Sequence, residues 1–171
     1  MEYAFKAVSM FGQTSIAIKG KDSCVVCCQK KVPDKLIVAD SITNIFPISE
    51  HIGAIMVGNM NDARYLVTYL RNTAAEFKYK YQYAVPVTVL ANRMAQYLQK
   101  YSQYAGIRPF CASVTLVGID EEFGSQCFRI DPTGLCVGFK AVSTGSKEQE
   151  AMTQLEKQAK KLGPGQDWDA R

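Results

Sequence analysis

The sequence has 171 residues, which fits one domain that buries about two thirds of the surface its unfolded chain exposes. Its composition, 47% hydrophobic and 21% charged, is that of a globular protein. A net charge of +4 is too small to indicate binding to nucleic acid or a membrane surface. No apolar run approaches the roughly 18 residues of a membrane-spanning helix, and the first residues lack an apolar secretory core. The six cysteines therefore predict reduced thiols in a cytosolic or nuclear protein.

The first segment has helical periodicity, which ends at Gly12. Two short apolar runs follow, at 14–20 and 23–29, and the turn "GKDS" between them predicts a β-hairpin. The run "HIGAIMVG" at 51–58 is typical of a strand that is buried on both faces.

Two long helices are predicted next. The first spans 61–81, and Asn61 or Asp62 is expected to cap its start. One face of this helix carries Leu66, Leu70, Thr73, Phe77 and Tyr81. Pro86 favours the first turn of a second helix, because its missing N–H has no partner there in any case. The stripe of the second helix consists of Leu90, Met94, Leu98 and Tyr101.

The last third of the chain predicts strands at 111–119, 126–130 and 135–139, and then a helix over 147–162 with Ser146 as its cap. We expect a single domain over residues 1–162, followed by a loop-like tail over 163–171. Because strands and helices occur in separate runs, the order indicates an α+β protein built as a layered sandwich.

Thr14 stands where a strand begins and raises the question of nucleophilic catalysis. A threonine hydroxyl is a poor nucleophile without a base, and one known solution uses the threonine's own free α-amine. Because Gln13 precedes Thr14, the nitrogen of Thr14 is an amide unless the chain is cut there. We therefore interpret Thr14 as a strand residue, which suits the preference of threonine for pleated sheets.

The cysteines Cys24, Cys27 and Cys28 form a CxxCC cluster. Side chains alternate along a strand, so Cys24 and Cys27 are expected on opposite faces, which does not suit a zinc site. We expect the three to act as small buried hydrophobic residues, with no metal bound. His51, the single histidine, has no sequence neighbour that would orient it as a base, and we interpret it as a surface or edge residue.

Three further stretches have an ordinary structural interpretation. "GFKAVSTGSK" at 138–147 does not fit a phosphate loop, because Gly145 is followed by Ser146 before the lysine. "FKYKYQY" at 77–83 mixes basic and aromatic residues, as single-stranded nucleic-acid binders do, but is interpreted as a helix end that packs on a neighbour. The acidic run at 120–122 (Asp120, Glu121, Glu122) is interpreted as a solvated turn.

Several stretches together resemble α-type subunits of the 20S proteasome, and the alpha type-6 kind most. They are "EYAFKAV" (2–8), "QTSIAIKGKD" (13–22), "QKKVPDKL" (29–36), "GNMNDAR" (58–64), "RPF" (108–110), "LVGIDEE" (116–122), "DPTG" (131–134), "GFKAVSTGS" (138–146) and "LEK" (155–157). The resemblance covers about residues 2–161. It implies the four-layer αββα sandwich of the N-terminal-nucleophile hydrolases, which agrees with the predicted order of elements.

The resemblance also implies a chain without catalysis and without a cofactor. Active β-type relatives carry a chain-terminal threonine, an aspartate and a lysine, and these positions correspond here to Gln13, Gln29 and Asn44. None of the three supplies a terminal amine, a carboxylate or an ammonium group. Some family members place a lysine at the position of Asn44, in a pocket that receives the carboxylate of a regulatory cap. Asn44 lacks that charge.

The partners that the resemblance implies are neighbouring α-type subunits in a seven-membered entry ring, the β ring and regulatory caps, in cytoplasm and nucleus. The expected subunit interface lies on the first helix and consists of Glu2, Tyr3, Ala4, Lys6, Ala7 and Val8. The implied process is protein degradation, including the ubiquitin-dependent kind.

The chain departs from the family pattern at both ends. The segment that normally precedes the first helix is missing, and after residue 161 the family's later helices and last strands are replaced by "GPGQDWDAR". The expectation is a partial fold, from a truncated isoform or an incomplete gene model. Two alternatives stay open: an assembly-incompetent variant, and a threonine-type hydrolase processed before Thr14.

Overall fold

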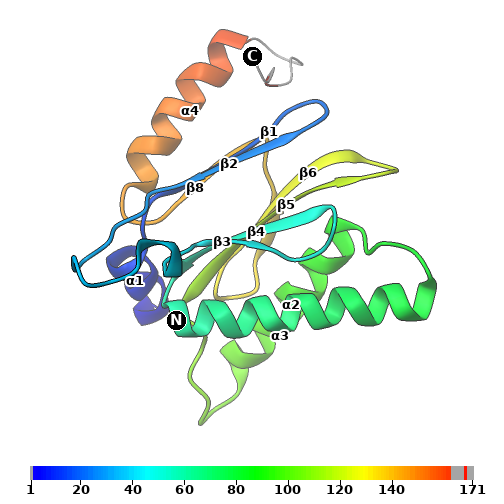
Figure 1. Ribbon diagram of the computed structural model, residues 1–171, viewed down its shortest axis with the longest axis horizontal. Helices are drawn as coiled ribbons and strands as arrows, with labels where there is room; N and C mark the ends of the chain where they lie inside the picture. Colours follow the sequence, from blue (N-terminus) through cyan, green and yellow to red (C-terminus); the bar gives the residue numbers. More distant parts are fainter. Residues whose placement is uncertain (1, 163–167, 169–171) are drawn as a thin grey trace.

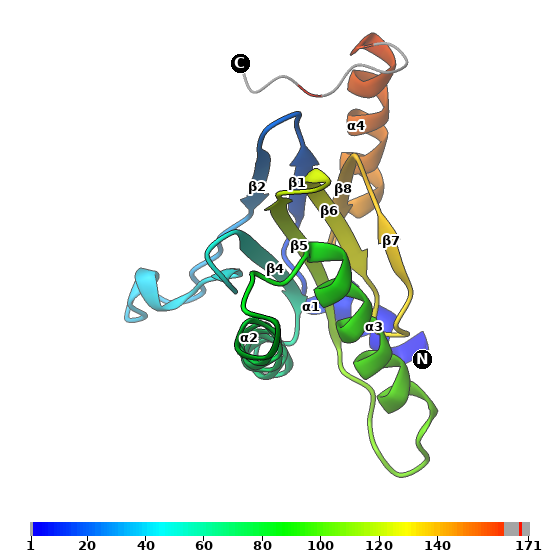
Figure 2. The same ribbon diagram turned by 90° about the vertical axis from the view of Figure 1, so that its right-hand side faces the viewer.

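A computed structural model describes residues 2–162 and residue 168. Two β-sheets lie face to face between helices, and this gives four layers in the order helix, sheet, sheet, helices (Figures 1 and 2). The predicted α+β class and the αββα sandwich are confirmed.

Four α-helices and one short 3-10 turn make up the helical part. They are α1 (Glu2–Phe11), α2 (Met60–Tyr81), α3 (Val87–Gln103), α4 (Glu148–Leu162) and the 3-10 turn Ala39–Ser41. The helices α2 and α3 cover the outer face of the larger sheet, and α4 packs along one edge of the smaller sheet (Figure 1). No helix in the described part of the chain is long and apolar enough to cross a membrane.

The smaller sheet has three strands in the order β2-β1-β8. They are β1 (Ser15–Lys19), β2 (Cys24–Cys28) and β8 (Ala141–Thr144). Strands β1 and β2 are antiparallel, with Ala17 opposite Val26, which confirms the predicted hairpin. Strand β8 was not predicted, because four residues are too few to show a period.

The larger sheet has five antiparallel strands in the order β3-β4-β5-β6-β7. They are β3 (Ile45–Pro47), β4 (Ile52–Gly58), β5 (Ala112–Asp120), β6 (Gly124–Ile130) and β7 (Cys136–Gly138). Strand β3, also not predicted, has only three residues. Strand β4 is buried on both faces, as predicted, because α2 lies on one side and the smaller sheet on the other.

Two apolar clusters hold the layers together. The larger lies between the five-stranded sheet and α2 and α3, and at its centre are Leu66, Leu70, Leu90, Met94 and Leu98. The predicted helix stripes are confirmed, except that Tyr81 is 45% exposed. The smaller cluster lies between the two sheets and includes Val8, Ala17 and Ile55.

The predicted caps of α2 and α4 were wrong, whereas Pro86 opens α3 as predicted. The cap of α2 is Asn59, whose side chain accepts the N–H of Asn61 at 2.9 Å, because β4 ends at Gly58 and the next residue is still extended. Pro86 lies directly before Val87, at the N-cap of α3. At the start of α4, the N–H of Lys147 donates to the hydroxyl of Thr14, so Thr14 and not Ser146 takes the capping role.

The predicted boundary at residue 162 stays a prediction. The tail over 163–171 falls outside the described residues except for Trp168, which forms a parallel bridge with Gly20.

Candidate functional site

Gln13, Thr14 and Gln29 lie together where β1 begins and β2 ends. The N–H of Gln29 donates to the carbonyl of Thr14 at 2.9 Å. The side-chain carbonyl of Gln13 accepts the N–H of Lys31 at 3.1 Å. The structure thus brings two of the three predicted degenerate positions to one end of the small sheet, where the backbone N–H of Gln29 and the side-chain oxygen of Gln13 join the segment before β1 to the segment after β2.

The hydroxyl of Thr14 acts in the fold as a helix cap. Its Oγ1 accepts the N–H of Lys147 at 3.2 Å and lies 3.4 Å from the hydroxyl of Ser146. Thr14 lies one residue before β1 rather than inside it. Because a capping oxygen satisfies an N–H that the helix leaves free, this contact ties β1 to α4 across 133 residues of sequence.

Gly145 keeps this junction close. It has a φ of 118°, and a side chain there would collide with the carbonyl of Gln13 and lie 3.0 Å from Cα of Thr14. Only glycine combines that backbone conformation with so close an approach. The prediction that Gly145 serves the turn before the last helix is confirmed.

A groove of about 560 Å³ opens beside this junction. Its lining consists of Thr14, Gln29, Lys147, Glu150, Ala151, Thr153 and Gln154. The amides and hydroxyls can hydrogen-bond a bound chain. Nucleophilic attack by Thr14 needs a proton acceptor for its hydroxyl, and the nitrogen of Thr14 is a peptide amide in this chain.

The third predicted position, Asn44, makes its contacts in another part of the fold, at the end of β4. Its amide donates to the carbonyl of Met56 at 3.0 Å and lies 3.6 Å from Sδ of Met60. The side chain is partly buried and holds the segment before β3 against the end of β4. Asn44 makes this contact with an uncharged amide.

Of the six predicted interface residues on α1, some are buried and the others are exposed. Ala4 and Val8 are buried against the chain's own sheets and Ala7 is half-buried. Glu2, Tyr3 and Lys6 are exposed, as are Phe5 and Met10 on the same helix; Tyr3 is 87% exposed.

The cysteines of β2 do point in opposite directions, as predicted. Cys24 lies between the sheets with its thiol 3.4 Å from the carbonyl of Gln126, and Cys27 is exposed. Burial raises the pKa of Cys24 and of Cys28. The prediction of three buried hydrophobic residues is wrong for Cys27, and Cys24 and Cys28 are half-buried. Among residues 2–162 and 168, no cluster of three metal-ligating side chains converges on one point.

Two ion-pair clusters were not predicted, because each joins residues 19 or more positions apart in sequence. Asp62, which is 6% exposed, accepts two bonds from Arg108, at 2.7 and 2.6 Å, and one from the N–H of Cys111 at 3.0 Å. The hydrogen bonds from Arg108 hold the pKa of Asp62 below its usual range, although burial opposes them. These three hydrogen bonds hold the loop before β5 against the first turn of α2.

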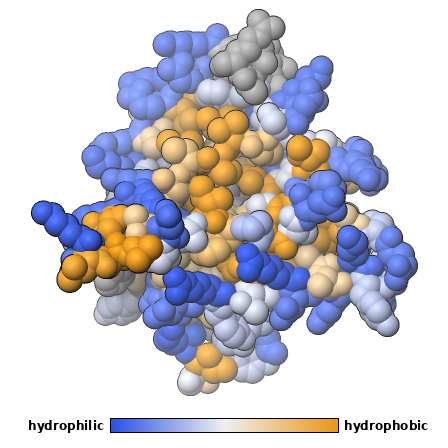
Figure 3. Space-filling model, in the orientation of Figure 1, coloured by the Kyte–Doolittle hydropathy of each residue, from blue (hydrophilic) through white to orange (hydrophobic). Residues whose placement is uncertain are grey.

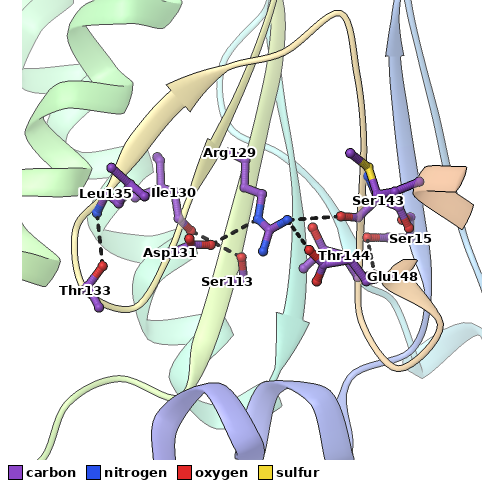
Figure 4. A network of polar contacts seen from close by, with 11 residues as sticks. Ser15, Ser113, Arg129, Ile130, Asp131, Thr133, Leu135, Ser143, Thr144 and Glu148 are labelled. Atoms are coloured by element: carbon purple, nitrogen blue, oxygen red, sulfur yellow. Dashed lines mark hydrogen bonds and ion pairs between the residues drawn. The ribbon is translucent and has the colours of Figure 1, made fainter. Parts of the chain in front are cut away.

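The second cluster centres on Arg129 of β6, which lies between the sheets (Figure 4). Its guanidinium binds Asp131 at 3.0 Å, Glu148 at 2.5 Å and the carbonyl of Ser143 at 3.3 Å. Glu148 begins α4, so Arg129 connects the larger sheet to the helix that borders the groove.

The acidic turn lies at the other end of the molecule. Glu121, Glu122 and His51 are exposed, which confirms the solvated turn and the surface histidine. Asp120 is half-buried and accepts the N–H of Val87 at 2.9 Å. These residues nevertheless line a cavity of about 200 Å³, a feature that the sequence did not indicate.

The predicted packing surface at 77–83 is partly internal. Tyr81 and Tyr83 pack on Phe77, with ring centroids 4.6 and 5.1 Å from it, while Tyr79 is 86% exposed.

The four-layer αββα sandwich is the architecture of the N-terminal-nucleophile hydrolases. The sequence profile of one family, described as "Proteasome subunit", matches residues 10–163. The chain belongs to the proteasome subunit family.

The similar proteins are named as alpha subunits. A "probable proteasome subunit alpha type-1" of Schizosaccharomyces pombe is 47% identical over 163 residues, 95% of this chain and 67% of the relative. A "proteasome subunit alpha type-6" of Caenorhabditis elegans is 40% identical over 94% of this chain and 65% of the relative. A "proteasome subunit alpha type-3" of Dictyostelium discoideum is 38% identical over 92% and 62%.

These relatives confirm the prediction of an α-type chain, the type to which the resemblance assigns no catalysis. A particular closeness to alpha type-6 stays a prediction. The chain spans about two thirds of the length of these relatives.

Proposed function

We propose that this chain is a structural subunit of the outer ring of the proteasome core, where it helps to form the entry for proteins that are to be degraded. The supporting observation is the use of Thr14: its nitrogen is in a peptide bond and its hydroxyl caps α4. The threonine beside the degenerate position Gln13 therefore holds two layers together. Ubiquitin-dependent degradation in cytoplasm and nucleus is the process in which such a ring would act.

The proposed contacts begin at α1. Its buried side, with Ala4 and Val8, fixes the helix on its own subunit, so the exposed Glu2, Tyr3 and Lys6 are left to meet a neighbouring α-type subunit. A tyrosine that is 87% exposed offers an anchor of the kind that interfaces favour. The β ring and regulatory caps are the further partners in this proposal.

Gln13, Gln29 and Asn44 are the proposed degenerate catalytic positions. The amide of Asn44 is engaged with Met56 and carries no charge, so it is a poor receptor for the terminal carboxylate of a cap. We expect Asn44→Ala to leave cap binding to assembled rings within about twofold of wild type. A loss of tenfold or more in a cap pull-down titration would contradict this assignment.

The test is incorporation into α rings. The chain is co-expressed with the other α-type subunits, complexes are separated on native gels, and their subunits are identified by mass spectrometry. Tyr3→Glu should reduce incorporation several-fold, while Tyr104→Glu, an exposed tyrosine at the end of α3, serves as the matched control. A chain that stays monomeric beside assembled rings would contradict the proposal and favour the assembly-incompetent variant.

A threonine-type hydrolase is the second candidate, because the groove of about 560 Å³ lies beside Thr14. It requires cleavage between Gln13 and Thr14, which mass spectrometry of the purified chain detects directly.

A further inference from the structure

Two cavities adjoin at the end of the molecule opposite α1, and together they are here called the end groove. The first, of about 200 Å³, is the cavity at the acidic turn. The second, of about 230 Å³, lies between the β3–β4 turn and the last turns of α2. Because Ser49, Ala84 and Val85 line both cavities, the two form one continuous depression. The α2–α3, β3–β4 and β5–β6 connections that form it lie together at the right of Figure 1.

The middle of the end groove is apolar. Val85 and Ile48 are buried and form its floor. Tyr83 and Phe123 line the cavity at the acidic turn and are 55% and 60% exposed, so their rings are open to a bound chain. At the right-hand edge of Figure 3, where these connections lie, hydrophobic atoms are set among hydrophilic ones. Apolar surface of this kind, with a polar border, is typical of sites that bind other proteins.

The segment between α2 and α3 also offers backbone groups to a bound chain. Within the described residues, no hydrogen bond uses the N–H or the C=O of Ala84 or of Val85. Both residues lie between the two helices, outside any helix or strand. Free backbone groups can pair with those of an extended peptide, as they do at the edge of a sheet.

The two ends of the end groove carry opposite charge. The charged side chains at the α2 end are Arg71, Lys78 and Glu50, which together are positive. The titratable side chains at the other end are His51, Asp120, Glu121 and Glu122. Complementary charge around apolar contacts gives a bound partner its register and orientation. A partner that matches the groove therefore carries a cation and an anion with apolar residues between them.

Asp120 has a hydrogen-bond acceptor that the fold leaves unused. Its Oδ1 accepts the N–H of Val87 at 2.9 Å, which fixes the carboxylate. Its Oδ2 is buried and has no hydrogen-bond partner within the described residues. A buried acceptor without a partner is costly, and the ammonium or guanidinium group of a bound chain would satisfy it.

We propose that the end groove binds an extended segment of another protein. A lysine or arginine of that segment reaches Oδ2 of Asp120, an acidic side chain reaches Lys78, and small aliphatic residues between them lie over Val85. Each cavity is smaller than the about 300–1,000 Å³ of small-molecule pockets, which suits it to single side chains. The inference does not depend on the proposed ring role, because one chain forms the whole groove.

The first experiment measures peptide binding to the purified full chain by fluorescence polarisation. The labelled probes have one to four alternating valines and alanines between two charged residues, with Gly-Ser flanks. One set is bipolar, with a lysine and a glutamate, and the matched sets have two lysines or two glutamates. The best bipolar peptide should bind at least about tenfold more tightly than either matched peptide. Equal binding of the lysine peptide, or no bipolar binding up to about 1 mM, would overturn the proposal.

The second experiment reverses one charge at each end of the groove. Lys78→Glu should weaken bipolar binding at least about tenfold and favour the peptide with two lysines, because both ends are then negative. Glu122→Lys should weaken bipolar binding too, and shift the preference toward the peptide with two glutamates. Asp120→Asn keeps an oxygen for the N–H of Val87 and removes the acceptor for the cation, so it should also weaken binding. Lys157→Glu, on the exposed side of α4, is the matched control and should change nothing.

Bipolar binding that is insensitive to both reversals would overturn the proposal. So would displacement of the peptide by an equal concentration of spermidine, which would show that the acidic end holds any aliphatic amine. These outcomes are separate from ring incorporation, which is measured on co-expressed subunits. A chain that binds the bipolar peptide but never enters α rings would refute the subunit role and leave the end groove intact.

Discussion

The ion pair between Asp62 and Arg108 offers a test of the fold, because one buried carboxylate accepts three hydrogen bonds, two from Arg108 and one from the N–H of Cys111. Asp62→Ala leaves the N–H of Cys111 without a partner, which costs about 1–2 kcal/mol. Loss of the pair with Arg108 adds about 1 kcal/mol or less, because the arginine side chain is 65% exposed and water replaces the carboxylate. We expect a fall of about 1–3 kcal/mol in the free energy of unfolding.

Asp62→Asn is expected to cost less, about 1 kcal/mol or below, since its amide oxygen can still accept the N–H of Cys111 and only the pair with Arg108 is lost. Asp40→Ala, at an exposed acid, is the control and should stay within about 0.5 kcal/mol of wild type. Urea unfolding followed by far-UV circular dichroism measures all three.

The contribution of Asp62 to the free energy of unfolding changes with pH in a defined direction. The pKa of Asp62 is lowered in the folded chain, so its contribution is fully present above the unfolded value of about 4 and is lost as the pH falls through the folded value. The gap between wild type and Asp62→Ala should therefore be constant near neutral pH and narrow below about pH 4. A gap under about 0.5 kcal/mol at pH 7, or one that widens in acid, would refute the reasoning.

Three further predictions concern the junctions between layers. Gly145→Ala should lower the free energy of unfolding in urea by about 2 kcal/mol or more, because the new side chain meets the backbone of Gln13. Gly106 also has a positive φ but open surroundings, so Gly106→Ala should lower it by about 1 kcal/mol. In the native chain at pH 8, iodoacetamide should modify Cys27 and spare Cys127, where burial raises the pKa to about 12; equal labelling by mass spectrometry would contradict this. Arg129→Met should speed hydrogen exchange in α4 and leave α2 unchanged, since it removes the contacts to Glu148 and Ser143. Unchanged exchange in α4 would show that the contacts of Arg129 do not stabilise this helix.

The parts of the fold that the sequence predicted are those with a long repeating pattern. The helices α2, α3 and α4 and the strands β4 and β5 each show a period or an apolar run over seven or more residues. Strands β3 and β8 are too short for such a pattern and exist because a neighbouring strand pairs with them. The cap of α2 was misplaced by two or three residues because the end of β4, not the composition of the helix, decides where the turn begins.

The candidate site was predicted by position but not by role. The identities of Gln13 and Gln29 already excluded acid–base catalysis, yet nothing local to Thr14 indicated that its hydroxyl binds Lys147 across 133 residues. Asp62 was predicted as a cap and is instead bonded to Arg108, 46 residues away. Contacts of this kind depend on how the layers stack, and a single sequence carries no direct record of that.

The central claim is that Thr14 serves the fold and cuts nothing, and treatment of the purified chain with a threonine-directed epoxyketone probe tests it most directly. The account predicts an intact mass without adduct, no peptide hydrolysis, and a loss of about 1 kcal/mol of stability in Thr14→Ala from the missing cap. An adduct on a chain that begins at Thr14, together with hydrolysis that Thr14→Ala abolishes, would contradict it.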